Sequence, residues 1–121
     1  MTTQTATGFD VEAMRRAIES ADLDAFLAMF TEDVEWIEID QRTPPAAPAR
    51  LHGRDPIGEQ VRAIVARGIT ATIEDGFVAG DRGAVRLTCT YPNGGRVVEH
   101  ALLELRDGRI ARWSAVQAWD D

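Results

Sequence analysis

Three tight-turn signatures in the second half of the sequence constrain the fold most. They are the strings GDRG, PNGG and RDG. Asn-Gly and Asp-Gly pairs are typical of β-hairpin turns, because those residues accept the positive φ angles that such turns need. The segments beside these turns are rich in β-branched and apolar residues, and they span residues 69–80, 84–91, 96–105 and 109–119. This pattern predicts a meander of four antiparallel strands.

Helices are predicted only in the first half of the chain. Asp10 and Asp22 are N-cap residues that each precede apolar side chains at helical spacing. A third helix is predicted with Asp55 as its N-cap and Pro56 at its first position, where proline is well tolerated. A further strand, DVEWIEID at residues 33–40, precedes this helix. Helices and strands segregated in this way indicate an α+β fold with helices on one face of a strongly curved antiparallel sheet.

Composition limits the classes of partner. The chain has 121 residues, 45% of them hydrophobic, which fits one domain over residues 9–121 after a threonine-rich flexible tail at residues 1–8. The formal net charge of −7, with scattered basic residues, argues against binding of nucleic acid or of anionic membranes. The N-terminus lacks the basic and apolar regions of a secretory signal, and no segment has the ~18 apolar residues of a membrane span. We therefore expect a cytoplasmic protein.

Metal and thiol chemistry have little support in the sequence. Cys89 is the single cysteine, which excludes an intramolecular disulfide and a cysteine-based zinc site. Cys89 lies in a strand-like segment, where a buried, unreactive thiol is expected. The two histidines, His52 and His100, lie far apart in the sequence and have no carboxylate at ligand spacing, so no metal site is predicted.

The strand at residues 33–40 raises the question of where its acids point. Side chains alternate between the two faces of a strand, so Trp36, Glu38 and Asp40 share one face. A carboxylate among apolar side chains favours its neutral form, and this suits a proton shuttle near pH 7. Glu38 is therefore either an acid in an apolar pocket beside Trp36 or a solvated charge at the strand end.

A second pair of candidates lies on the segment 96–105. Glu99 and His100 are adjacent, so they point to opposite faces, and only one can line a pocket. Their apolar neighbours do not decide which one it is. On the last segment, Trp113, Gln117 and Trp119 share a face, with the two tryptophans as pocket wall or dimer interface and the glutamine as a polar contact for a ligand. Tyr91, just before the PNGG turn, is expected either at the pocket rim or packed against the turn.

Three strings resemble the SnoaL-like proteins, in the superfamily of nuclear transport factor 2, ketosteroid isomerase and limonene epoxide hydrolase. They are ADLDAFLAMFTEDVEW, LHGRDPIGEQV and LRDGRIARW, and with the order of elements the resemblance covers roughly residues 10–119. It implies a cone in which a curved sheet wraps around three helices and leaves a deep apolar pocket. Such families include isomerases, polyketide cyclases, epoxide hydrolases and domains without chemistry, so fold alone does not decide function.

The resemblance also implies roles for individual positions. Glu38 falls on the proton-shuttling carboxylate of ketosteroid isomerases, and Glu99 falls on their proton-donating acid. Met14 replaces the tyrosine that holds the oxyanion, and methionine cannot donate a hydrogen bond. Ala115 stands where related cyclases and hydrolases often carry an acid. These two departures argue against steroid isomerisation and epoxide hydrolysis.

Two functions follow as hypotheses. The first is cofactor-free acid–base catalysis on a small hydrophobic carbonyl compound by isomerisation, aldol-type cyclisation or dehydration, with Glu38 as base and Glu99 or His100 as donor. The second is a non-catalytic ligand-binding or dimerisation domain. Apolar residues on both faces of the later strands predict a homodimer through the outer face of the sheet. The residues expected to contact a ligand are Met14, Trp36, Asp40, Tyr91, Trp113 and Gln117.

Overall fold

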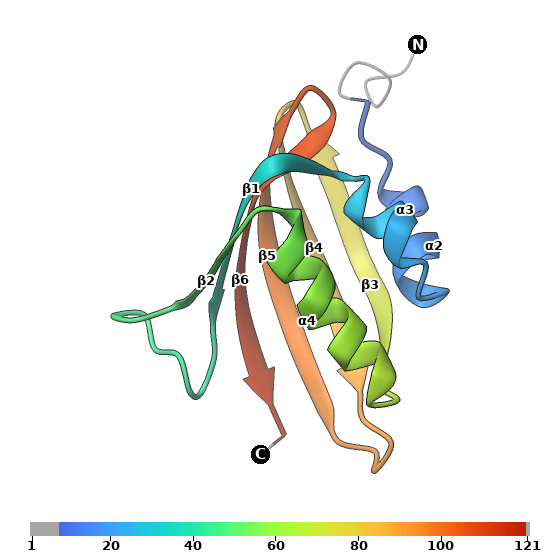
Figure 1. Cartoon of the computed structure of the whole chain (residues 1–121), viewed down its shortest axis with the longest axis vertical. Coiled ribbons are helices and arrows are strands. Elements are labelled where there is room, and N and C mark those ends of the chain that lie inside the picture. Colours follow the sequence, from blue (N-terminus) through green and yellow to red (C-terminus); the bar gives the residue numbers. More distant parts are fainter. Residues whose placement is uncertain (1–7, 121) are drawn as a thin grey trace.

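The computed structural model describes residues 8–120, and its main feature is a curved six-stranded sheet in the order β2-β1-β6-β5-β4-β3. Three helices lie on one face of the sheet, so the predicted α+β fold is confirmed (Figure 1). The sheet is open, because its edge strands β2 and β3 do not pair with each other. The elements in chain order are α2 (Val11–Glu19), α3 (Leu23–Leu27), β1 (Phe30–Ile39), β2 (Ala49–His52), α4 (Arg54–Ala66), β3 (Thr70–Ala79), β4 (Arg82–Thr90), β5 (Arg96–Arg106) and β6 (Arg109–Trp119).

The predicted meander is confirmed by β3 to β6, which pair antiparallel in sequence order. Asp107 and Gly108 connect β5 to β6 with φ angles of 53° and 77°, the positive values that a two-residue hairpin turn requires. In the PNGG turn, the backbone N–H of Tyr91 donates to the carbonyl of Gly95 at 2.8 Å. Residues 1–7 of the predicted flexible tail, and residue 121, lie outside the described residues.

The prediction of a wholly antiparallel sheet is wrong at one pair of strands. β1 runs parallel to β6, with Trp36 opposite Trp113 and Glu38 opposite Ala115. β2 then pairs antiparallel with the other side of β1. The turn signatures that predicted the sheet report only strands joined by short loops, whereas β1 and β6 meet from opposite ends of the sequence.

The helices begin largely where their caps predict. The Asp10 carboxylate accepts a backbone N–H of the first turn of α2 at 2.9 Å, and Asp22 does the same for α3 at 3.1 Å. The predicted cap of α4 is wrong, because Gly53 occupies the N-cap with φ of 84° and Asp55 lies inside the first turn. Arg54, the first residue of α4, ties the helix to β1, since its guanidinium Nε donates to the Phe30 carbonyl at 3.0 Å.

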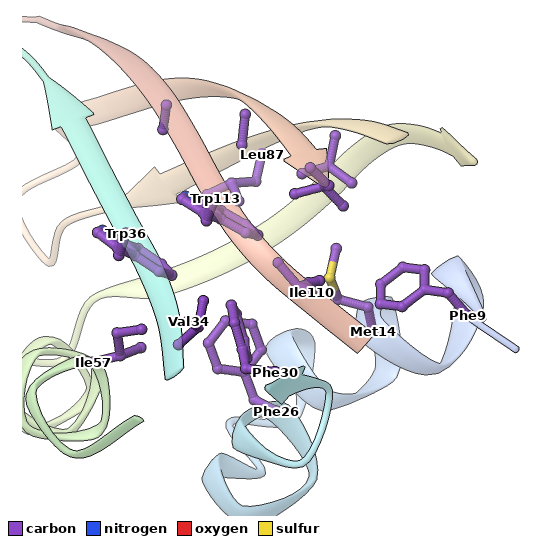
Figure 2. Packing of buried hydrophobic residues seen from close by; sticks show 14 of the residues in the cluster. Phe9, Met14, Phe26, Phe30, Val34, Trp36, Ile57, Leu87, Ile110 and Trp113 are labelled. Atoms are coloured by element: carbon purple, nitrogen blue, oxygen red, sulfur yellow. The ribbon is translucent and has the colours of Figure 1, made fainter. Parts of the chain in front are cut away.

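Aromatic side chains form the centre of the core. The rings of Trp36 and Trp113 stack with centroids 4.7 Å apart and planes only 4° from parallel. Phe30 lies against both rings, and Phe26 of α3 meets Phe30 edge-on at 4.9 Å (Figure 2). Edge-on and offset stacked rings are favourable beyond the apolar area they bury. This cluster joins α3 to the two parallel strands and fixes one wall of the cavity described next.

Candidate functional site

A cavity of about 290 Å³ lies between the helices and the sheet. Its walls are predominantly apolar, and they come from α2, α3, α4, the start of β3 and the inner face of the sheet. Trp36 and Trp113, the stacked pair, belong to these walls. The volume suits a small molecule, and predominantly apolar walls with a few polar groups are typical of ligand sites.

Two carboxylates meet in this apolar cavity. Glu38 of β1 and Glu99 of β5 are only 8% and 5% exposed, and both belong to the cavity wall. β6 lies between their strands, and its Gln117 connects them. The amide nitrogen of Gln117 donates to Glu38 Oε2 at 3.1 Å and to Glu99 Oε1 at 2.8 Å. Residues 38, 99 and 117 are therefore brought together from three strands by the fold.

Each oxygen of the two carboxylates accepts a hydrogen bond. The indole Nε1 of Trp113 donates to Glu99 Oε2 at 3.0 Å, and Gln60 of α4 donates to Glu38 Oε1 at 3.4 Å. Buried carboxylates need such donors, because an unpaired buried charge is strongly unfavourable. The donors to Glu99 are the shorter ones, so the amide and the indole hold that carboxyl firmly in one orientation.

The cavity changes the acidity of Glu99. Burial and then the neighbouring charge of Glu38 raise the pKa of Glu99 to about 8, against the lowering effect of the hydrogen bonds from Gln117 and Trp113. At neutral pH Glu99 therefore holds a proton that it can donate. A buried carboxyl group kept protonated at neutral pH is suited to act as a general acid.

Cys89 also lines the cavity, a position that was not predicted. Burial, followed by the charges of Glu99 and Glu38, raises the pKa of the Cys89 thiol to about 11. The thiolate is the reactive form of cysteine, so this side chain stays protonated and unreactive at neutral pH. The expectation of a strand cysteine without nucleophilic chemistry agrees with this environment.

Four of the predicted site residues lie outside the cavity wall. His100 points to the exposed outer face of β5, opposite to Glu99. Asp40 follows the end of β1 and accepts the backbone N–H of Arg42 at 2.7 Å, so it shapes a turn. Met14 is fully buried in the core near Phe9 and Ile110 (Figure 2). The ring of Tyr91 lies under the Arg67 guanidinium.

Gln60 is the polar residue of the site that sequence reasoning missed. Its position three residues after the buried Ile57 places it near the inward face of α4, and this spacing could have identified it. Within residues 8–120 there is no cluster of three or more His, Cys, Asp or Glu side chains that could hold a metal ion. None of the described helices is long and apolar enough to cross a membrane.

Comparison with known proteins identifies the family. The model of the SnoaL-like domain matches residues 11–113. The chain belongs to this family. A comparison with curated protein sequences found no match.

Solved structures show the same fold. An NTF2-like protein of unknown function from Mesorhizobium loti is 25% identical, with a TM-score of 0.73 over 100% of this chain and 97% of that one. A candidate polyketide cyclase from Sinorhizobium meliloti is 26% identical, with a TM-score of 0.65 over 87% and 91% of the two chains. A candidate ketosteroid isomerase from Kribbella flavida is 20% identical, with a TM-score of 0.70 over 92% and 75%. The predicted membership of the SnoaL-like and NTF2-like superfamily is thus confirmed.

Proposed function

We propose that this SnoaL-like domain binds a small hydrophobic carbonyl compound and transfers a proton next to the carbonyl group. The observation that carries the proposal is the pair of buried carboxyl groups, Glu38 and Glu99, joined by Gln117 in an apolar cavity. An apolar cavity favours a hydrophobic ligand, and the pair supplies one acid and one base. The relationship to the candidate polyketide cyclase, whose chemistry would act on carbonyl groups, points in the same direction.

The reaction would use Glu38 as the base and Glu99 as the acid. Glu38 takes a proton from the carbon next to the carbonyl, and the electrons of that C–H bond form the double bond of an enol. Glu99 gives its proton to the carbonyl oxygen as that oxygen gains negative charge. Glu38 then gives its proton to the same carbon or to another one while the enol O–H returns its proton to Glu99, which restores the carbonyl and both carboxyl groups. General acid–base catalysis of this kind contributes about a hundredfold or more in rate.

Deuterium exchange tests the proposal without knowledge of the natural substrate. The protein is incubated in D₂O with a panel of small hydrophobic ketones, and deuterium at the carbon next to the carbonyl is measured by mass spectrometry. We expect the wild type to accelerate exchange for at least one ketone. Glu38→Gln should abolish that acceleration while keeping ligand affinity, because an amide preserves shape but cannot take the proton.

Glu104→Gln is the matched control, because it makes the same chemical change on the exposed side of β5. It should leave the exchange rate unchanged. The rate should fall as pH rises through about 8, where Glu99 loses the proton it donates. Exchange by Glu38→Gln at the wild-type rate would contradict the assignment of the base.

Ligand binding without turnover is the second candidate. It is favoured by the absence of a phenol donor: Tyr91 is the chain's single tyrosine and lies outside the cavity wall, and Met14 occupies the position of the family tyrosine. Binding can be followed separately by the fluorescence of Trp36 and Trp113, which line the cavity. Ketones that change this fluorescence and never exchange would support the binding domain over the enzyme.

A further inference from the structure

Gln117 has a defined orientation in the site. Its Oε1 accepts the indole N–H of Trp119 at 2.9 Å. An indole nitrogen can only donate a hydrogen bond, so the carbonyl end of the amide must face Trp119. The NH₂ end then faces the two carboxylates, and its two hydrogens serve Glu38 and Glu99 separately. The amide is held at both ends.

We propose that Gln117, oriented by Trp119, is a positioning residue that holds Glu38 and Glu99 together and controls how firmly the pair keeps its proton. It rests on the proposed function, because it concerns the same two carboxyl groups. It adds Gln117, which holds the two acids but gives or takes no proton itself, and Trp119, which acts only through the Gln117 amide.

The physical basis is the competition around Glu99. Burial and the charge of Glu38 favour the protonated form of Glu99, whereas an N–H donor favours the ionised form. Gln117 gives the shortest of the hydrogen bonds to this pair, 2.8 Å, and so opposes the first two effects most directly. Without it, Glu99 would keep its proton to higher pH and exchange it less readily near neutrality.

Other groups facing the cavity do not supply an equivalent effect. The further titratable side chains in its wall are Cys89 from β4, Glu19 from α2 and Asp22 at the start of α3. Among the described residues that line the cavity there is no lysine, arginine or histidine. The pair therefore depends on neutral N–H donors, and Gln117 alone among them reaches both carboxylates.

NMR titration of the ligand-free protein tests the inference. The chain has three tryptophans, so three indole N–H resonances are expected, and Trp→Phe variants assign them. The Trp113 resonance reports the ionisation of Glu99, because its N–H donates to that carboxyl. Trp36 Nε1 has no hydrogen-bond partner among the described residues, so its resonance serves as the internal reference.

Gln117→Met removes the donors and keeps a side chain of similar length. We expect the Trp113 titration midpoint to rise from about 8 by about one pH unit or more, the size that follows from losing a hydrogen bond to a charged group. Gln60→Met is the matched control, since Gln60 lines the same cavity and makes only a 3.4 Å hydrogen bond to Glu38. Its midpoint should stay near that of the wild type.

An unchanged midpoint in Gln117→Met, or an equal rise in Gln60→Met, would overturn the inference. Trp119→Phe provides a second test if Gln117→Met fails to fold, because it leaves Gln117 in place but frees its amide to turn. A smaller rise of the midpoint is expected there, and no rise would count against the role of Gln117. Failure of deuterium exchange would reject the proposed enzyme but leave these midpoints untouched, so the two failures are distinguishable.

Discussion

Glu99→Gln should make the protein more stable at high pH and change its stability little at low pH. In the folded protein the pKa of Glu99 is raised from 4.5 to about 8 by burial and by Glu38. Below about pH 4.5 the folded and unfolded states both hold the proton, and Glu99 adds no pH dependence. Between that pH and about 8 only the folded state keeps the proton. The free energy of unfolding of the wild type therefore falls as pH rises across this window.

The size of the effect follows from the same values. The interval from 4.5 to about 8 is about 3.5 pH units, and at ~1.4 kcal/mol for each unit this corresponds to about 5 kcal/mol. Glutamine has one carbonyl oxygen for the two donors of residues 113 and 117, and its NH₂ faces the other donor, so one buried donor is left unsatisfied at a cost of about 1–3 kcal/mol. The free energy of unfolding of Glu99→Gln should thus be close to or slightly below that of the wild type at pH 5 and a few kcal/mol above it at pH 9.

Urea unfolding at intervals between pH 5 and pH 9 measures this difference. Carboxyl groups away from the pair titrate equally in both proteins, so the difference between the two stability curves reports Glu99 together with its coupling to Glu38. Glu104→Gln provides the control on the same strand, where an exposed carboxylate 3.9 Å from Arg112 contributes little to stability. A difference between Glu99→Gln and the wild type that stays constant with pH would refute the reasoning.

Three further predictions concern other parts of the molecule. Cys89, whose pKa is raised to about 11 by burial, should react slowly with iodoacetamide at pH 8 in the folded protein and rapidly in urea; fast reaction in both would contradict its enclosure. Asp10→Ala should lower the free energy of unfolding by about 1 kcal/mol, measured by thermal or urea unfolding, since its carboxylate caps α2. The homodimer expected from the sequence would cover Phe77, Leu102 and Val116, which are 64%, 66% and 56% exposed. Sedimentation should show twice the 13.3 kDa chain mass, and Leu102→Glu should shift it to a single chain; a monomeric wild type at tens of micromolar would refute this prediction.

Local chemistry made the elements predictable. The hairpin turn at Asp107-Gly108 and the caps at Asp10 and Asp22 depend on a few adjacent residues, and each lies where the sequence places it. The cap of α4 shows the limit of the same reasoning. Asp55 follows the local preference for an N-cap, but the helix begins before it, at Arg54, whose guanidinium makes a tertiary contact with the carbonyl of Phe30. No local pattern could reveal that contact, because the two residues lie 24 positions apart.

The sequence leaves open whether Glu99 or His100 points into the cavity from β5, and the register of the sheet decides it. Glu99 and His100 have apolar neighbours on both sides, so alternation alone leaves either one as the pocket residue. The structure selects Glu99 because its register places Leu87 of β4 and Gln117 of β6 beside it, both of which line the cavity. The register of three neighbouring strands depends on the whole sheet, so it is difficult to predict from a single sequence.

The parallel pairing of β1 with β6 decides what the site can do. β6 separates the two strands that carry the acids, so Glu38 and Glu99 are not cross-strand neighbours and cannot be placed together by counting along either strand. A side chain from the strand between them reaches both carboxyl groups, and because it is neutral it adds no charge to an already acidic pair. The sequence identifies Gln117 as a polar group on the correct face of the last strand. Its function as the bridge follows only from the strand order, and for this reason the pair of acids and the amide between them must be tested as one unit.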